Sequence, residues 1–108
     1  MSKTKYTRAE ILDTAKEYVT KDRAATHGDM ESNLTAISHL WSIYLDTLIK
    51  PHEVGVMMTL LKCARSMSNP HHADNYIDGA GYLSCSAELI ARKPQDKSEA
   101  VVFQGGNT

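Results

Sequence analysis

Apolar residues recur three and four positions apart in four segments of the chain, a spacing that predicts four helices. Ahead of the first segment, Thr7 and Glu10 form the T-x-x-E pattern of a capping box, which predicts a helix from about Thr7 to the low twenties. The second segment follows Asp29, a residue suited to cap a helix start, and carries the strongest stripe. That stripe consists of Leu34, Ile37, Leu40, Trp41, Tyr44, Leu45 and Leu48.

Prolines mark the limits of the other two segments. Pro51 breaks the second pattern and is well placed to open a third helix, because its fixed backbone angle suits the first helical position. The pair Asn69 and Pro70 ends that helix, since the residue before a proline avoids helical geometry. Asp74 is expected to cap a fourth helix, which Pro94 closes.

Four helices joined by short loops predict an all-α fold, a small four-helix bundle. We expect residues 1–93 to form one helical domain and residues 94–108 to form a tail that is flexible or docks on a neighbour. Four short helices leave a thin core, so we also expect a homo-oligomer. A dimer is the commonest closed arrangement.

Composition narrows the class of protein. The 108 residues include 12 basic and 13 acidic side chains, and this balance argues against binding to a nucleic-acid duplex, which favours a strong basic excess. No apolar run approaches the roughly 20 residues of a membrane span, and the N-terminus lacks the apolar core of a signal peptide. We therefore expect a cytoplasmic protein that binds no membrane. In that reducing compartment, Cys63 and Cys85 are expected to be free, buried thiols.

Two basic residues of the third helix are candidates for anion binding. Lys62 and Arg65 are three residues apart, so they share a helix face within an otherwise apolar segment. A lysine and a guanidinium together favour an anion, and phosphate is the obvious one. Alternatively, both side chains extend out of the core to reach water.

Two acidic residues of the fourth helix are candidates for a metal site. Asp74 and Asp78 are four residues apart on one face, with His71 and His72 nearby. Two carboxylates can hold a divalent cation such as Mg²⁺. They can also form ion pairs with the two cations of the third helix.

Gly79 and Gly81 interrupt the same fourth helix, where each costs about 1 kcal/mol relative to alanine. A helix without side chains at these points lets a neighbouring helix or a ligand approach its backbone. Approach of the third helix would bring the acidic and basic pairs together. The same opening also suits a packed dimer seam.

The segment RAATHGDMESN places His27 and Asp29 in a loop that leads into the second helix. Free backbone N–H groups at a helix start can receive a phosphate, whereas Asp29 and Glu31 favour hydrogen-bonding or metal roles. Simple capping beside a glycine turn is the alternative. The chain has no P-loop, G-x-S-x-G, C-x-x-C or H-E-x-x-H motif.

Three blocks together resemble a family of small phage and prophage proteins of uncharacterised function. They read RAATHGDMESNL with LWSIYL, VGVMMTLLKCARSMSNPHH, and ADNYIDGAGYLSCSAEL. Members of that family have a Y/H-G-D loop, a tryptophan-bearing helix, an L-K-x-A-R helix and a D-x-x-x-D-x-x-G-Y helix. The resemblance covers residues 23 to 91 and implies a protein of a bacterial host's cytoplasm.

The last block also resembles the final helix of MazG-like domains, which are all-α proteins that handle nucleoside triphosphates, often with Mg²⁺ held by carboxylates. This resemblance implies a MazG-like bundle and Mg²⁺ as a possible cofactor. The pattern of that group has E-E-x-x-E on an early helix, whereas this chain has Glu10, Asp13 and Glu17. The departure favours nucleotide binding over catalysis.

The resemblance implies a site in which Lys62 and Arg65 neutralise phosphate, while Asp78 orients Arg65 or, with Asp74, binds Mg²⁺. The residues that it favours as ligands are His27, Asp29, Lys62, Arg65, Asp74, Asp78, Tyr82 and Trp41, with Tyr82 or Trp41 stacked on the base. We therefore expect a phage-type protein that binds a nucleotide or cyclic nucleotide, including one that sequesters a signal of antiviral defence. The alternatives are a Mg²⁺-dependent nucleoside triphosphate pyrophosphohydrolase and a non-catalytic module that inhibits a host protein.

Overall fold

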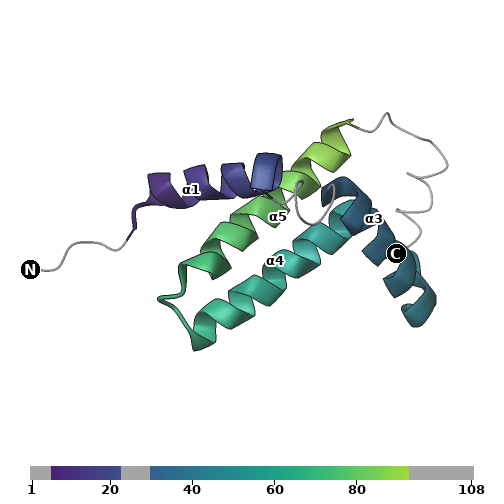
Figure 1. The fold of residues 1–108 in the computed structure, drawn as a ribbon. Coiled ribbons are helices and arrows are strands. Elements are labelled where there is room, and N and C mark those ends of the chain that lie inside the picture. The colour runs from purple at the N-terminus through teal and green to yellow at the C-terminus, as the bar shows by residue number, and fades with distance from the viewer. Residues whose placement is uncertain (1–5, 23–29, 93–108) are drawn as a thin grey trace, which may run out of the picture.

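The fold of the protein, taken from a computed structural model that describes residues 6–22 and 30–92, consists in those two ranges of helices and the short segments that join them (Figure 1). The elements are α1 (Arg8–Glu17), a π-helix η1 (Tyr18–Asp22) that continues it, α3 (Met30–Leu45), α4 (Pro51–Ser68) and α5 (Ala73–Arg92). The described residues contain no strand, so the predicted all-α fold with four helices is confirmed. None of the described helices is long and apolar enough to cross a membrane.

The longest pair of helices forms the centre of the molecule. α4 and α5 lie side by side as an antiparallel hairpin joined by residues 69–72, and α1 crosses α5 (Figure 1). α3 packs on the hairpin near its own start, and its C-terminal part extends away from α4 and α5 (Figure 1). The hairpin therefore positions every other described element.

The main hydrophobic core lies where α3, α4 and α5 meet. Leu34, Ile49, Val54 and Leu89 form one buried cluster, one residue from each of these helices and one from the linker before α4. The partly buried side chains that pack on this cluster are Met30, Ile37, Trp41, Met58, Tyr82 and Cys85. The core is thus small for three helices of 16 to 20 residues.

Local hydrogen bonds explain the start of α1, whereas the predicted start of the fourth helix is corrected by the structure. The capping box of α1 forms as predicted, because Thr7 Oγ1 accepts the Glu10 N–H at 3.1 Å and Glu10 Oε1 accepts the Thr7 N–H at 2.8 Å. The prediction that Asp74 caps the fourth helix is wrong. α5 begins at Ala73, so Asp74 lies in its first turn, where the helix dipole still favours a carboxylate.

The end of the second helix also differs from the prediction. The apolar stripe continues to Leu48, but α3 ends at Leu45 and Asp46 takes a left-handed conformation with φ of 53°. That conformation ends a helix whatever the pattern beyond it. Leu48 consequently lies in the linker.

The two glycines of α5 have two different neighbours. Gly79 is buried against α4, where an added Cβ would lie 3.9 Å from both Lys62 Cβ and Thr59 Cγ2. Gly81 is buried against η1, and a Cβ there would lie 3.0 Å from Val19 Cγ1. The predicted approach of the third helix is therefore confirmed at Gly79, whereas Gly81 makes room for the segment that follows α1.

A third glycine, on α4, allows the closest approach. A Cβ at Gly55 would overlap Ser86 Oγ and lie 3.1 Å from the backbone oxygen of Tyr82. Ser86 Oγ donates a hydrogen bond to the His52 backbone oxygen at 2.8 Å, which ties α5 to the first turn of α4. The close contact of Gly55 with Ser86 therefore fixes which residues of α4 and α5 lie opposite each other.

Candidate functional site

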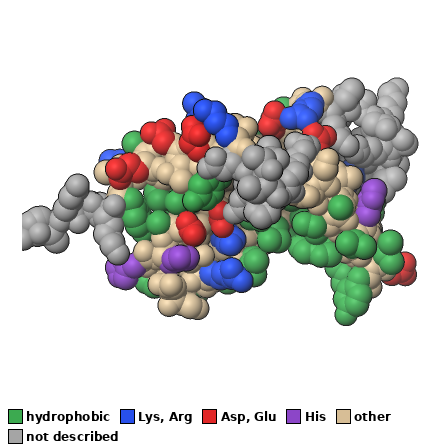
Figure 2. Space-filling model, in the orientation of Figure 1, with side chains coloured by type: hydrophobic (Ala, Val, Ile, Leu, Met, Phe, Trp, Pro, Cys, Tyr) green, Lys and Arg blue, Asp and Glu red, His purple; other side chains and the backbone are tan. Residues whose placement is uncertain are grey.

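An open pocket of about 400 Å³ lies where α4 ends and α5 begins. The described residues that line it all have polar or charged side chains: Lys62, Arg65, Ser68, Asn69, His72, Asp74, Asn75 and Asp78. Figure 2 shows basic, acidic and histidine side chains gathered over this end of the hairpin. Four of the predicted site residues, Lys62, Arg65, Asp74 and Asp78, therefore share one pocket.

The innermost charged groups of the pocket form an ion pair. Lys62 Nζ lies 3.1 Å from Asp78 Oδ2, and each side chain is only 14% exposed. Gly79 next to Asp78 lets α4 approach closely enough for this contact. The sequence left open whether Asp78 binds a metal or forms an ion pair with a cation of the third helix. The structure shows Asp78 paired with Lys62 across the bundle.

Arg65 lies one turn further along α4, on the exposed rim of the same pocket. Within the part of the chain that the structure describes, its guanidinium takes part in no ion pair or hydrogen bond. Asp74 is also exposed, and its Oδ2 lies 3.9 Å from His72 Nε2. The rim thus offers a guanidinium in contact with solvent, with an acidic group on the facing helix.

Three polar residues of the lining are absent from the predicted site, and His72 was predicted only as a neighbour of the two aspartates. Ser68 and Asn69 end α4, His72 precedes α5, and Asn75 is a buried polar residue in its first turn. Asn75 lies three positions before Asp78, so helical spacing places both residues on one face of α5. This spacing is the sequence signal from which Asn75 could have been predicted as a site residue. The start of α5 also adds backbone N–H groups that have no partner within the helix.

The other predicted ligands lie elsewhere. Trp41 and Tyr82 pack against the hydrophobic core, and neither lines the pocket. Tyr82 instead borders a small hollow of about 10 Å³ beside η1, together with Gly81 and Asp78. His27 and Asp29 lie outside the described residues, as does the C-terminal tail.

The side chains of this pocket differ from the ligand set of a metal centre. Asp74 and Asp78 line the pocket, but Asp78 pairs with Lys62, and the described residues contain no group of three histidine, cysteine, aspartate or glutamate side chains placed to hold a metal. These residues do not fit a Mg²⁺ centre built by the protein alone. One or two carboxylates suit only Mg²⁺ that arrives with phosphate ligands of its own.

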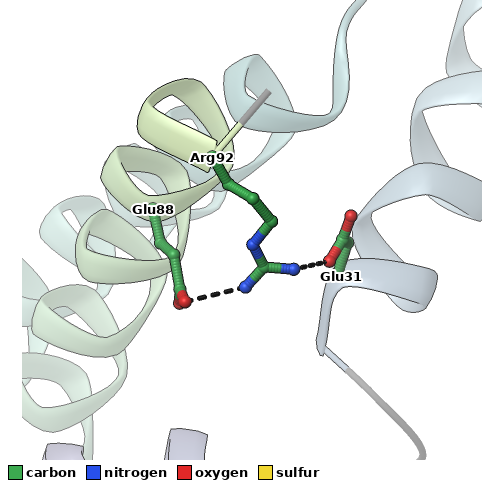
Figure 3. Close-up of polar contacts among 3 residues, drawn as sticks. All are labelled: Glu31, Glu88 and Arg92. Carbon is green, nitrogen blue, oxygen red and sulfur yellow. Dashed lines mark hydrogen bonds and ion pairs between the residues drawn. The ribbon is translucent and has the colours of Figure 1, made fainter. Parts of the chain in front are cut away.

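A second hollow of about 380 Å³ lies between α1, α3 and α5 and has a different character. Among the described residues that line it, Arg92 is held between two carboxylates, Glu88 on the same helix and Glu31 on α3 (Figure 3). The Glu88 contact measures 2.7 Å, and the Glu31 contact joins α3 to the end of α5. Because both carboxylates already neutralise this guanidinium, Arg92 is less available to an anion than Arg65 is, although Lys16 on α1 also lines the hollow.

Neither cysteine forms a disulfide, as predicted, but neither is buried. Cys63 is exposed on α4, and Cys85 is half-buried on α5. The prediction of burial was wrong for Cys63 because its position on α4 faces away from α5 and no other described helix covers it.

A family model described as a domain of unknown function, DUF6378, matches residues 10–90, a range that includes the whole pocket. The chain belongs to the DUF6378 family. Its relatives include the Gene 55 protein of Mycobacterium phage L5, 44% identical over 88 residues, and the Gene 55 protein of Mycobacterium phage D29, 33% identical over 84 residues. These alignments cover 81% and 78% of this chain but 55% of each relative, so the chain spans about half the length of both.

The predicted resemblance to phage proteins of unknown function is therefore confirmed for this DUF6378 chain. No solved structure matches it.

Proposed function

We propose that this DUF6378 protein is a phage-type nucleotide-binding protein and that it binds the phosphate of a nucleotide in the pocket at the α4–α5 hairpin end. The observation that supports the proposal is the exposed guanidinium of Arg65 on the rim of this pocket. No other described group forms an ion pair or hydrogen bond with it. A guanidinium in this state can donate two parallel hydrogen bonds to a phosphate.

Two further features favour an anion at this rim. The N-terminus of α5 lines the pocket through His72, Asp74 and Asn75, and the positive end of a 20-residue helix attracts negative charge. Lys62 neutralises Asp78, so this inner carboxylate repels an incoming phosphate less than a free one would. Phosphate binding is then centred on Arg65, with Lys62 as an inner support.

The remaining polar groups favour a nucleotide over inorganic phosphate. Asp74 is an acceptor, and Asn69 and Asn75 are both donors and acceptors, which suits the hydroxyl and amino groups of a ribose and a base. A volume of about 400 Å³ also lies within the range of small-molecule sites. Neither Trp41 nor Tyr82 lines the pocket, so the proposal assigns no base stacking to them.

Differential scanning fluorimetry and calorimetry against nucleoside triphosphates and cyclic oligonucleotides, with and without Mg²⁺, test the proposal. We expect at least one nucleotide to raise the melting temperature and Arg65→Ala to weaken its binding roughly 10- to 100-fold, the value of a charge-assisted hydrogen bond. Arg8→Ala is the matched control, because Arg8 is an exposed arginine at the start of α1 and does not line the pocket. If no nucleotide shifts the melting temperature, or if both variants weaken binding equally, the proposal is wrong.

Sequestration of a nucleotide signal of antiviral defence is the form of this function that we favour. A protein that only holds a ligand needs phosphate contacts but no metal cluster, and the donor set of the pocket matches that requirement more closely. Chromatography of the nucleotide after prolonged incubation distinguishes holding from turnover. Recovery of intact nucleotide on denaturing the complex is the expected result.

A Mg²⁺-dependent pyrophosphohydrolase is the second candidate, favoured by the position of Asp74 and Asp78 in one pocket. It requires Mg²⁺-dependent release of pyrophosphate that is lost in Asp78→Asn. Absence of release from the unmodified protein rejects this candidate and leaves the binding proposal intact.

A further inference from the structure

The side of α4 that faces away from α5 is apolar, and no other described helix covers it. Its exposed residues are Val56, Met57, Leu60, Leu61, Cys63, Ala64 and Met67, which we call the α4 outer face. Between residues 54 and 68, the charged side chains of α4 are Lys62 and Arg65, and both lie outside this face on the helical wheel. An exposed apolar surface of this length on a helix is typical of an interface.

The outer end of α3 and the start of the linker after it are also apolar and exposed. Leu40, Ile43, Tyr44, Leu45 and the linker residue Leu48 are each between 53% and 86% exposed, and together we call them the outer end of α3. Figure 2 shows hydrophobic side chains gathered at the end of the molecule where α3 extends away from the hairpin. No aspartate, glutamate, lysine or arginine occurs from residue 32 to residue 45.

We propose that a second copy of the chain packs on the α4 outer face and the outer end of α3, forming a homodimer with two-fold symmetry. The first argument is area. Ten large side chains in these two regions are 38% to 86% exposed. Because a large side chain has on the order of 200 Å² of surface, they offer on the order of 1,000 Å², above the roughly 800 Å² per partner of a standard interface.

The second argument concerns the identity of the partner. A two-fold interface brings the same surface of both subunits together, so a charged residue near the axis would meet its own copy and be repelled. The α4 outer face lacks charge and avoids that repulsion, whereas a face built for a different protein commonly carries charges complementary to it. Its composition therefore favours a second copy.

The third argument is the small core. Leu34 and Val54 are the only large hydrophobic side chains of the described ranges that are at most 1% exposed. Small domains gain stability by oligomerisation when one chain cannot bury enough apolar surface. A second copy would cover the apolar residues that the single chain leaves in water.

An antiparallel α4 pair places the apolar faces of both copies in contact. Leu60 lies near the middle of the 18 residues of α4, with Val56 on one side and Met67 on the other along the same face. In an antiparallel pair with its axis near Leu60, each Leu60 packs against the other, and Cys63 lies within the contact. Arg65 stays outside it, so the pocket remains open in the dimer.

Sedimentation and light scattering on Leu60→Glu test the proposal. The expected mass of the unmodified protein is twice the 12.0 kDa of one chain, and Leu60→Glu is expected to be a monomer. Leu12→Glu on α1 is the matched control, because Leu12 is 61% exposed and Leu60 is 62% exposed. A monomeric unmodified protein, or equal effects of the two variants, would overturn the proposal; a monomer would leave the face to a different partner.

A second measurement does not depend on the folding of a variant. In the background Cys85→Ala, the rate at which a maleimide labels Cys63 should fall as protein concentration rises, because the dimer covers this exposed thiol. A rate that is the same from the low micromolar to the several hundred micromolar range contradicts the proposed contact.

Discussion

At the scale of single residues, Gly55 is the most constrained position of the α4–α5 contact. For Gly55→Ala, the new methyl group would force Ser86 to rotate and break its bond to His52, and the nearby backbone oxygen of Tyr82 cannot move aside as easily. We expect a loss of about 1–3 kcal/mol in the free energy of unfolding, as for other overpacked sites. Urea denaturation measures this loss.

Gly79→Ala is the matched comparison for this prediction. A methyl group at Gly79 meets Lys62 and Thr59 at 3.9 Å, an ordinary contact distance, and alanine is favoured over glycine inside a helix by about 1 kcal/mol. We expect this variant to be as stable as the unmodified protein or more stable. Equal destabilisation by both variants would contradict the assigned packing.

The sequence predicted part of this residue-scale picture. Gly79 stands out because glycine is unfavourable inside a helix that also carries spaced aspartates, and the inferred approach of α4 followed from it. The role of Gly55 was not predictable, because its partner Ser86 is 31 positions away and only the packed hairpin brings them together. Exposure of Arg65 likewise depends on which helix covers that side of α4, and helical spacing does not determine this.

At the scale of elements, the junction between α3 and α4 depends on one hydroxyl group. Ser42 Oγ accepts the Ile49 N–H at 2.9 Å and donates to the Ile49 backbone oxygen at 3.2 Å. For Ser42→Ala we expect a loss of about 1–3 kcal/mol, because two backbone groups of a buried residue lose their partner. Thermal unfolding measures the effect.

Ser66→Ala is the control for the junction. Ser66 Oγ donates at 2.7 Å to the Cys63 backbone oxygen within α4, so its loss leaves the contacts between elements unchanged. We expect a change within about 0.5 kcal/mol, the usual range for surface substitutions. A similar loss in both variants would show that Ser42 acts only within its own helix.

The starts of α1 and α4 were more predictable than the end of α3. The capping box at Thr7 and the proline at the start of α4 are local features, so the sequence displays them. The left-handed Asp46 and the π-helical turn after α1 depend on where the chain packs next. The apolar pattern continues past the end of α3 for that reason, because Leu48 is apolar without being helical.

At the scale of the whole molecule, the proposed dimer makes stability depend on concentration. Dissociation accompanies unfolding if the second copy covers the α4 outer face, so the melting temperature should rise with protein concentration. Calorimetry over a wide concentration range measures this, and Leu60→Glu should melt at one temperature throughout. A constant melting temperature for the unmodified protein would be inconsistent with a dimer that contributes to stability.

The arrangement of the helices was the least predictable feature. Periodicity indicates that a helix has an apolar face but does not identify the element that covers it, and the stripe of α3 contains both buried Leu34 and exposed Tyr44. A uniform four-helix bundle would have buried both. The hairpin with two peripheral helices is instead set by the close packing of α4 on α5.

The short connection in that hairpin has a consequence for how the chain folds. Only residues 69–72 separate α4 from α5, so closing this loop restricts little of the chain, and contacts near in sequence form fastest. By contrast, α1 meets α5 across more than fifty intervening residues. We therefore expect the hairpin to act as the folding nucleus on which the N-terminal helix docks late, so that the residues of the proposed phosphate pocket come together before the rest of the molecule is assembled.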